Sequence, residues 1–320
     1  AELEKLIGLD NVTRDGRKIN VYANIGSPED VDKVLLNDAG GIGLFRSEFL
    51  YLGREDYPSE EEQFEIYKEV LSRMEGKKVI IRTLDIGADK QVDYFKLPKE
   101  ENPAMGYRAI RICLDRIDVF KTQLRAIYRA SVYGTAAIMF PMIISVKEIL
   151  RIKEIVEEVK VELTAAGIEI APVELGIMVE TPAAVMISEE LAKEVSFFSI
   201  GTNDLTGYTM AADRGNPDVA YLYSAYNPAV LRSIRNIISA ANKEDIMAGM
   251  CGEAASDPLL VPVLLGFGLN EFSVSATAIL ATRKVMSLWT MDECKALVDE
   301  VMQLETEAEV KALLEERARS

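Results

Sequence analysis

The 320-residue sequence contains no histidine. The side chain that most often acts as acid or base near neutral pH is therefore missing, and so is the commonest ligand of transition metals. Chemistry on this chain has to use carboxylates, arginines, lysines and cysteine. A zinc site is not expected, and a histidine nucleophile would have to come from elsewhere.

Cysteine is also scarce, and the three cysteines are widely spaced with no C-x-x-C pair. This pattern predicts neither a disulfide framework nor a thiolate metal site, and it favours a reducing cytoplasm. We expect Cys113 and Cys294 to be inert small hydrophobes in helices. No uninterrupted run of eighteen apolar residues occurs, and the first residues lack the pattern of a signal peptide, so membrane insertion is not expected.

Positive charge is in the minority, with 36 Lys and Arg against 52 Asp and Glu and a net charge of −16. Such an acidic balance argues against nucleic acid and anionic membranes as partners. Hydrophobic residues make up 49% of the chain, enough for a large core, which excludes a mainly disordered protein. The length allows two ordinary domains or one large barrel.

Short apolar or β-branched runs alternate with longer segments of helical period, which is typical of β-α units around a parallel sheet. We predict eight strands, at Ile19–Ile25, Gly41–Phe45, Lys78–Thr83, Ala136–Pro141, Leu175–Glu180, Phe197–Gly201, Ile246–Cys251 and Glu271–Val274. Eight strands with eight crossovers predict an α/β fold, a (β/α)₈ barrel. Because no Gly/Ser-rich linker appears, we expect residues 1–320 to form a single domain.

Helix start and stop signals fill the gaps between these strands. Proline in the first turn, Ser-Glu-Glu-Glu at residue 59 and a terminal glycine at 167 are examples. They predict helices at Pro28–Ala39, Ser59–Met74, Val146–Ala166, Pro182–Lys193, Pro228–Asn242 and Pro258–Leu265. Two extra C-terminal helices, Met291–Leu304 and Thr306–Arg319, are expected to close the barrel.

In such a barrel the active groups lie just after the carboxyl ends of the strands. Four arginines fall in or just beyond these positions: Arg46, Arg82, Arg108 and Arg214. Converging guanidinium groups repel one another unless they bind an anion, and each planar fork pairs two oxygens of a carboxylate or phosphate. The cluster predicts a small ligand with several negative charges. For Arg82 alone, a strand-end ion pair with Asp85 is an equal alternative.

Carboxylates follow two further strand ends, Glu180 after the fifth and Asp204 after the sixth. Two oxygen ligands with water and substrate phosphate suit Mg²⁺. For Glu180, capping of the helix that begins at Thr181-Pro182 is the alternative role. Gly201 precedes a polar loop in which backbone N–H groups could approach a phosphate, which favours the ligand site. Cys251, between two glycines at a strand end, is a candidate proton donor or acceptor.

Seven segments occur in the order found in one known family. They resemble the C-terminal phosphoenolpyruvate-binding domain of Enzyme I of the bacterial sugar phosphotransferase system, and they are Gly43–Leu52, Arg82–Gly87, Glu101–Arg111, Met139–Ile143, Val179–Ala184, Ser199–Thr206 and Gly249–Glu253. This resemblance implies a (β/α)₈ barrel that binds phosphoenolpyruvate and Mg²⁺, usually dimerises, and releases pyruvate after phosphoryl transfer.

The resemblance also implies a role for each candidate residue. Glu180 and Asp204 would hold Mg²⁺, and Cys251 would protonate the enolate. The phosphoryl and carboxylate groups would be bound by a further set: Arg46, Arg82, Asn203 and Arg214, supported by Arg108. The acceptor in the family is a histidine on a separate N-terminal domain, which passes the phosphoryl group to the phosphocarrier protein. Since the chain has no histidine, we expect that domain to be absent from it.

Two other functions stay open at this point. A non-catalytic phosphoenolpyruvate sensor would keep the arginines and carboxylates but would not need Cys251. A lyase or aldolase acting on a pyruvate enolate would share the barrel and Mg²⁺, but would have less use for four arginines.

Overall fold

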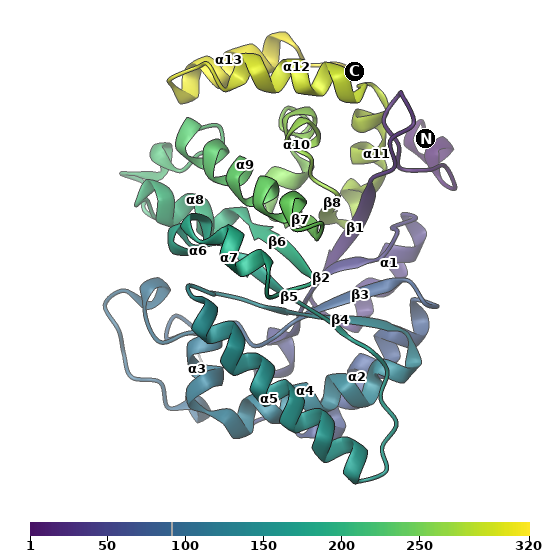
Figure 1. Cartoon of the computed structure of the whole chain (residues 1–320), viewed down its shortest axis with the longest axis vertical. Coiled ribbons are helices and arrows are strands. Elements are labelled where there is room, and N and C mark those ends of the chain that lie inside the picture. Colours follow the sequence, from purple (N-terminus) through teal and green to yellow (C-terminus); the bar gives the residue numbers. More distant parts are fainter. Residues whose placement is uncertain (91) are drawn as a thin grey trace.

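The computed structural model describes residues 1–90 and 92–320 and contains a closed barrel of eight parallel strands (Figure 1). Neighbouring strands in the barrel are also neighbours in the sequence, as expected for repeated β-α units. The strands are β1 Asn20–Ile25, β2 Ile42–Arg46, β3 Lys78–Arg82, β4 Thr135–Phe140, β5 Glu174–Val179, β6 Phe197–Gly201, β7 Met247–Cys251 and β8 Glu271–Ser275.

This architecture confirms the predicted (β/α)₈ barrel, with each strand bound within one residue of its predicted position. Side chains alternate between two faces along each strand. Outward-facing residues such as Val21, Ile81 and Phe198 join the main core between the strands and the helices. Inward-facing Leu44 and Met178 belong to a second apolar cluster that fills part of the barrel interior.

The helices surround this barrel (Figure 1). They are α1 Val31–Leu36, α2 Glu60–Arg73, α3 Ile110–Asp115, α4 Ile117–Ala130, α5 Val146–Ala165, α6 Pro182–Met186, α7 Ser188–Ala192, α8 Thr202–Met210, α9 Pro228–Lys243, α10 Val261–Phe267, α11 Ile279–Ser287, α12 Met291–Val301 and α13 Glu307–Glu316. Short 3-10 turns connect several of them.

Several local features differ from the prediction. The predicted helix Pro28–Ala39 is a 3-10 turn, Pro28–Asp30, followed by α1, which ends at Leu36, and α12 and α13 each end three residues earlier than predicted. The polar segment after β6 is the helix α8 and not a loop, the predicted helix at 182–193 is split into α6 and α7, and α10 begins at Val261 rather than Pro258. Ser59 caps α2 by accepting a hydrogen bond from the Glu62 N–H, but the reciprocal bond of a capping box is not formed. A complete capping box occurs instead at Ser145 and Glu148, before α5.

The extra helices α12 and α13 lie together outside α9, α10 and α11 (Figure 1). Helix α12 packs against α10, and the Arg319 guanidinium lies 3.8 Å from the centre of the Trp289 ring. Helix α11 holds the N-terminal part of the chain: buried Arg283 donates hydrogen bonds to Asn11, to the Leu6 carbonyl and to Asp38. None of the helices in the described ranges is both long enough and apolar enough to cross a membrane.

Candidate active site at the mouth of the barrel

A cavity of about 480 Å³ opens at the carboxyl ends of the strands. The barrel brings nearly all the predicted site residues to this one cavity. Those lining it are Arg46, Arg82, Glu180, Asn203, Asp204, Arg214 and Cys251. Arg108 is not part of the lining and lies behind it, in contact with Asp204.

Arg82, the last residue of β3, is held between two carboxylates. Its Nη2 lies 3.2 Å from Glu48 Oε1 and its Nη1 lies 3.4 Å from Asp85 Oδ2. Burial disfavours the charged form, but the two carboxylates raise the pKa of Arg82 above its ordinary value. The ion pair with Asp85, which the sequence offered as an alternative role, is thus formed. The buried Nε of Arg82 nevertheless has no hydrogen-bond partner. The guanidinium group lines the cavity and its Nε–H remains available to a bound ligand.

Arg108 extends this row of charges toward α8. Its Nη2 lies 2.8 Å from Asp85 Oδ1 and 3.4 Å from Asp204 Oδ2, and its Nη1 donates to the Tyr208 hydroxyl. Although burial opposes it, Arg82 and Arg108 hold the pKa of Asp85 below its usual range. Positive and negative groups thus alternate from Glu48 to Asp204 across the mouth.

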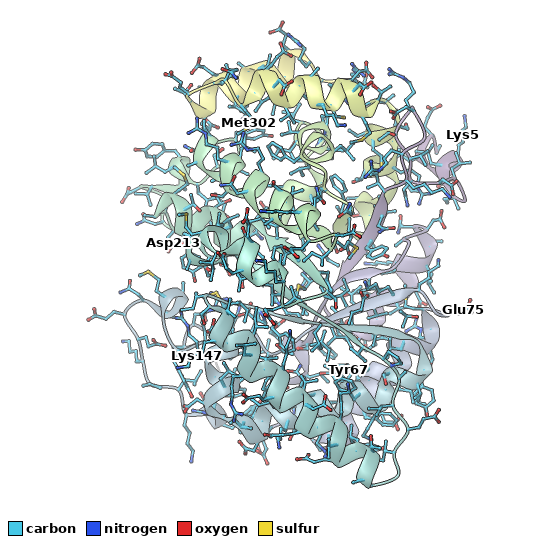
Figure 2. The ribbon with its side chains drawn as sticks, viewed as in Figure 1. Lys5, Tyr67, Glu75, Lys147, Asp213 and Met302 are labelled. Carbon is cyan, nitrogen blue, oxygen red and sulfur yellow. The ribbon has the colours of Figure 1, made fainter. Side chains whose placement is uncertain are left out.

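Arg46 and Arg214 are more exposed than this row. Arg46 makes no ion pair within the described parts of the chain, and Arg214 Nη1 lies 3.4 Å from Glu253 Oε1. Arg214 follows Asp213, labelled in Figure 2 just past α8. Both guanidinium groups border the cavity while most of their donors remain available, so they can turn toward a bound anion.

Glu180 follows β5 and is 2% exposed. Its Oε1 accepts a hydrogen bond of 2.7 Å from the Met142 N–H, and Met142 has a positive φ of 61°. The cap of α6 is Thr181, whose Oγ1 accepts from the Ala184 N–H, so the alternative role of Glu180 as a helix cap is wrong. Burial, followed by the nearby Asp204 and Asp85, raises the pKa of Glu180 well above its usual value.

The surroundings of Glu180 and Asp204 show whether these two carboxylates fit Mg²⁺ as ligands. Glu180 is buried beside a second carboxylate, an arrangement that is costly unless a proton or cation compensates it. Gly201 leaves room for the Glu180 carboxylate, since a Cβ at position 201 would lie 3.0 Å from Glu180 Oε2. Among the residues described, no group of three or more acidic or thiol side chains forms a metal cluster. Two protein carboxylates completed by water and phosphate nevertheless fit Mg²⁺.

Helix α8 supplies Asn203 and Asp204 from its first turn. The Asn203 carbonyl accepts a hydrogen bond of 2.7 Å from the Tyr223 hydroxyl, and its Oδ1 accepts a long one from the Glu253 N–H. These contacts hold Asn203 between α8 and the segment after β7. Buried Thr202 Oγ1 has no partner and lies where a side chain at Gly252 would clash.

Cys251 ends β7 and is 2% exposed. Burial raises the pKa of its thiol to about 11, so the group carries its proton at neutral pH. The Ser199 hydroxyl donates to its sulfur at 3.5 Å, and the thiol lies 3.7 Å from the Ile200 carbonyl oxygen. A protonated thiol that lines the cavity is able to donate a proton to a bound ligand.

The backbone beside Arg108 is strained. Ala109 is fully buried and has φ 53° and ψ −126°, a region that residues other than glycine rarely adopt. Its N–H donates to the Ile86 carbonyl. This hydrogen bond joins the residue after Arg108 to the residue after Asp85.

The sequence analysis missed several side chains that support the site. Glu48 pairs with Arg82, Tyr208 contacts Arg108, and Ser199 contacts Cys251. For Glu48 a signal existed, because it is a carboxylate within an otherwise apolar stretch after β2. Tyr208 and Ser199 gave none, because their roles depend on contacts with residues distant in the sequence.

Comparison with known proteins places these motifs in a family. Residues 1–291 match the family described as "PEP-utilising enzyme, PEP-binding domain". The chain is 51% identical over 317 residues to the phosphoenolpyruvate-protein phosphotransferase of Bacillus subtilis, covering 99% of this chain and 56% of that protein. It is 53% identical over 311 residues to that of Geobacillus stearothermophilus, covering 97% of this chain and 54% of that protein.

The chain therefore spans about half the length of these relatives. Among solved structures, a citrate lyase from Burkholderia xenovorans is similar, with a TM-score of 0.55, 16% identity, and coverage of 95% of this chain and 92% of that one. At that identity the likeness concerns the fold only. The family match and the identities to the phosphotransferases show that this chain belongs to the family of phosphoenolpyruvate-binding domains of phosphoenolpyruvate-utilising enzymes.

Proposed function

We propose that residues 1–320 act as one unit that binds phosphoenolpyruvate and Mg²⁺ and transfers the phosphoryl group to a histidine on a separate domain, releasing pyruvate. The observation that carries this proposal is the convergence of Arg46, Arg82 and Arg214 on the cavity that Glu180 and Cys251 also line. In the relatives named as phosphotransferases, about half of the protein lies outside the matched region, which leaves room for the accepting domain.

The side chains would divide the work by chemistry. The three arginines lining the cavity would hold the phosphate and carboxylate oxygens, with Asn203 as a neutral donor. Glu180 and Asp204 would hold Mg²⁺, which supplies charge neutralisation to the phosphoryl oxygens when bound. Arg108 would keep Asp85 and Asp204 in place.

Cys251 would act on the other product. Loss of the phosphoryl group leaves the enolate of pyruvate, whose C3 carbon needs a proton. The thiol carries that proton at neutral pH because burial raises its pKa to about 11. Its place at the cavity wall supports the role of proton donor. The remaining partners, a second copy of the chain, a phosphocarrier protein and a cytoplasmic setting, are proposed from the relatives' function.

Calorimetric titration of phosphoenolpyruvate into the chain tests the site. We expect binding with Mg²⁺ that is lost in excess chelator. Asp204→Asn should weaken binding at least about tenfold, because a metal ligand and a partner of Arg108 change together. Asp213→Asn is the matched control: it removes the same charge from an exposed neighbouring position and should change affinity less than about twofold.

The same preparations separate the alternative functions. If phosphoenolpyruvate binds but the chain, mixed with a histidine-bearing domain from a relative, forms no pyruvate, the sensor hypothesis is favoured. Cleavage of a C–C bond in a 2-oxo acid without phosphate would favour the lyase. Absence of binding with and without Mg²⁺ would contradict the proposed site.

A further inference from the structure

The barrel interior holds a buried carboxyl group that the proposed mechanism does not use. Glu271, the first residue of β8, is 1% exposed, and its Oε1 has no hydrogen-bond partner. Two glycines make room for it. A Cβ at Gly43 would lie 2.4 Å from Glu271 Oε1, and a Cβ at Gly249 would lie 2.3 Å from Oε2. The carboxyl group therefore occupies the space that side chains of β2 and β7 would otherwise fill.

This position puts Glu271 deeper in the barrel than Cys251, whose partner on β8 is Ser273. Gly249 pairs with Glu271 across β7 and β8, and Glu271 Oε2 fills the Cβ position of Gly249, whose partner on the other side, across β6 and β7, is Ser199. Cys251 is two residues further along β7 on the same face, about 7 Å higher. The Ser199 hydroxyl, which donates to Cys251 at 3.5 Å, thus stands between the residue beside the Glu271 carboxyl group and the thiol.

Few charges face this carboxyl group. Lys78 on β3 is the nearest cation, but its Nζ lies 2.6 Å from Glu174 Oε1 on β5. Tyr22 on β1 stays neutral, since burial, Glu271 and Glu174 raise its pKa to about 12. Burial raises the pKa of Glu271 to about 8, only partly opposed by Lys78, so at neutral pH it carries a proton.

Polar groups of β8 and β1 lie between Glu271 and the mouth. The Ser273 hydroxyl donates to Asn24 Oδ1 at 2.5 Å, and Asn24 borders the cavity. This side of the interior is polar, whereas the interiors of such barrels are usually packed with branched apolar side chains. It offers a route by which a proton could return from solvent.

We propose that Glu271 is a buried proton reservoir that restores the thiol of Cys251 after each turnover, with the Ser199 hydroxyl as the relay. This inference rests on the proposed role of Cys251. The thiol gives its proton to C3 of the enolate, which yields pyruvate and a thiolate. The Ser199 hydroxyl passes its proton to the thiolate and receives that of the Glu271 carboxyl. The Glu271 carboxylate then regains a proton from solvent.

Ketonisation of enolpyruvate tests the relay without an accepting histidine. Enolpyruvate is released from phosphoenolpyruvate by a phosphatase, mixed with the chain and Mg²⁺, and followed by the loss of its ultraviolet absorbance. The wild-type chain should catalyse many turnovers. Glu271→Gln keeps the shape but cannot supply a proton, so it should give one fast turnover per chain and then a steady rate at least about tenfold lower. Glu189→Gln, which removes an exposed carboxylate of α7 that pairs with Lys243, is the control and should behave as the wild type.

The outcomes separate this inference from the proposed function. Continuous wild-type turnover by Glu271→Gln, with Cys251→Ala inactive, would overturn the reservoir and leave the role of Cys251 intact. Activity of Cys251→Ala, or no acceleration by a wild-type chain that binds phosphoenolpyruvate, would overturn both. Glu271→Gln should bind phosphoenolpyruvate with the affinity of the wild type. This control excludes a general loss of structure as the cause of a lower steady rate.

The wild-type chain alone decides the question if Glu271→Gln does not fold. Its steady rate should be constant at lower pH and fall as the pH rises through about 8, where the reservoir empties. The first turnover should show no such change. A steady rate without an inflection near that pH would overturn the proposal.

Discussion

The Arg82 side chain, only 12% exposed, lies between two carboxylates, and the charges at the mouth depend on it most. Its removal would leave Glu48 and Asp85 in a low-dielectric site without their shared cation. Burial already raises the pKa of Glu48, with Arg82 as the largest opposing influence. The same side chain would thus serve the ligand and the stability of the empty protein.

We therefore expect Arg82→Met to abolish detectable phosphoenolpyruvate binding and to lower the free energy of unfolding by about 3 kcal/mol, as for other broken buried ion pairs. Arg125→Met is the control. Arg125 pairs with Glu60 and Glu162 in a more exposed network, so its loss should cost at most about 1 kcal/mol. Denaturant unfolding measures both, and equal costs would contradict the assigned burial of Arg82.

Glu271 leads to a prediction on stability against pH. Its folded pKa of about 8 lies above the unfolded value of 4.5, so the folded chain binds the proton more tightly. The stabilisation is complete below pH 4.5 and is lost as the pH rises through about 8. At about 1.4 kcal/mol per unit, the loss is on the order of 5 kcal/mol. Unfolding curves of Glu271→Gln should lack this decline relative to the wild type; parallel curves would count against it.

At the scale of single elements, α5 illustrates how local sequence stabilises the barrel wall. Ser145 accepts a hydrogen bond from the Glu148 N–H, and the Glu148 side chain accepts one from the Ser145 N–H. The apolar stripe of α5, which includes Ile152 and Val159, is buried against the core. The cap and the stripe together position a helix of 20 residues.

Ser145→Ala should lower the free energy of unfolding by about 1 kcal/mol, the usual value of an N-cap. Ser233→Ala on α9 is the matched control, because that hydroxyl only donates to the Ala229 carbonyl one turn back on an exposed face. We expect the control to change stability by less than about 0.5 kcal/mol. Chemical denaturation of the two variants checks this, and similar losses would argue against the capping box.

The strands and the positions at their ends could be predicted from the sequence because buried parallel strands are continuous apolar runs, and a barrel places the next polar residue at the mouth. The loop predicted after β6 was wrong, because this segment forms helix α8. Glycine, threonine and asparagine favour loops, but tertiary contacts stabilise the helix here. Glu271 could not be assigned from sequence, because its environment is created by Gly43 and Gly249 on other strands.

At the scale of the whole molecule, the family match ends at residue 291, the first residue of α12, so the rest of α12 and all of α13 lie beyond it. Helix α13 buries only Val310 and Leu314, and it meets the segment before α9 through Ser224 and Glu307. It is thus an addition to the barrel wall, away from the strands.

Removal of residues 306–320 should lower the free energy of unfolding by about 2 kcal/mol, the scale of two apolar side chains less the entropy of ordering the helix. The affinity for phosphoenolpyruvate should stay within about twofold of that of the full chain. Thermal unfolding and calorimetry of the truncated chain measure the two effects. A truncated chain that binds much more weakly would show that α13 also supports the mouth.

The alternating row from Glu48 to Asp204 means that the pocket contains its own competing anions. At Arg82 and Arg108 a ligand does not meet unpaired positive charge; it competes there with carboxylates that already pair with the two guanidinium groups. Chloride and acetate carry one charge and can pair with at most one guanidinium group. Their binding free energy would not compensate for the ion pairs that they displace. Selection among the small anions of a cell would then follow from charge number and spacing.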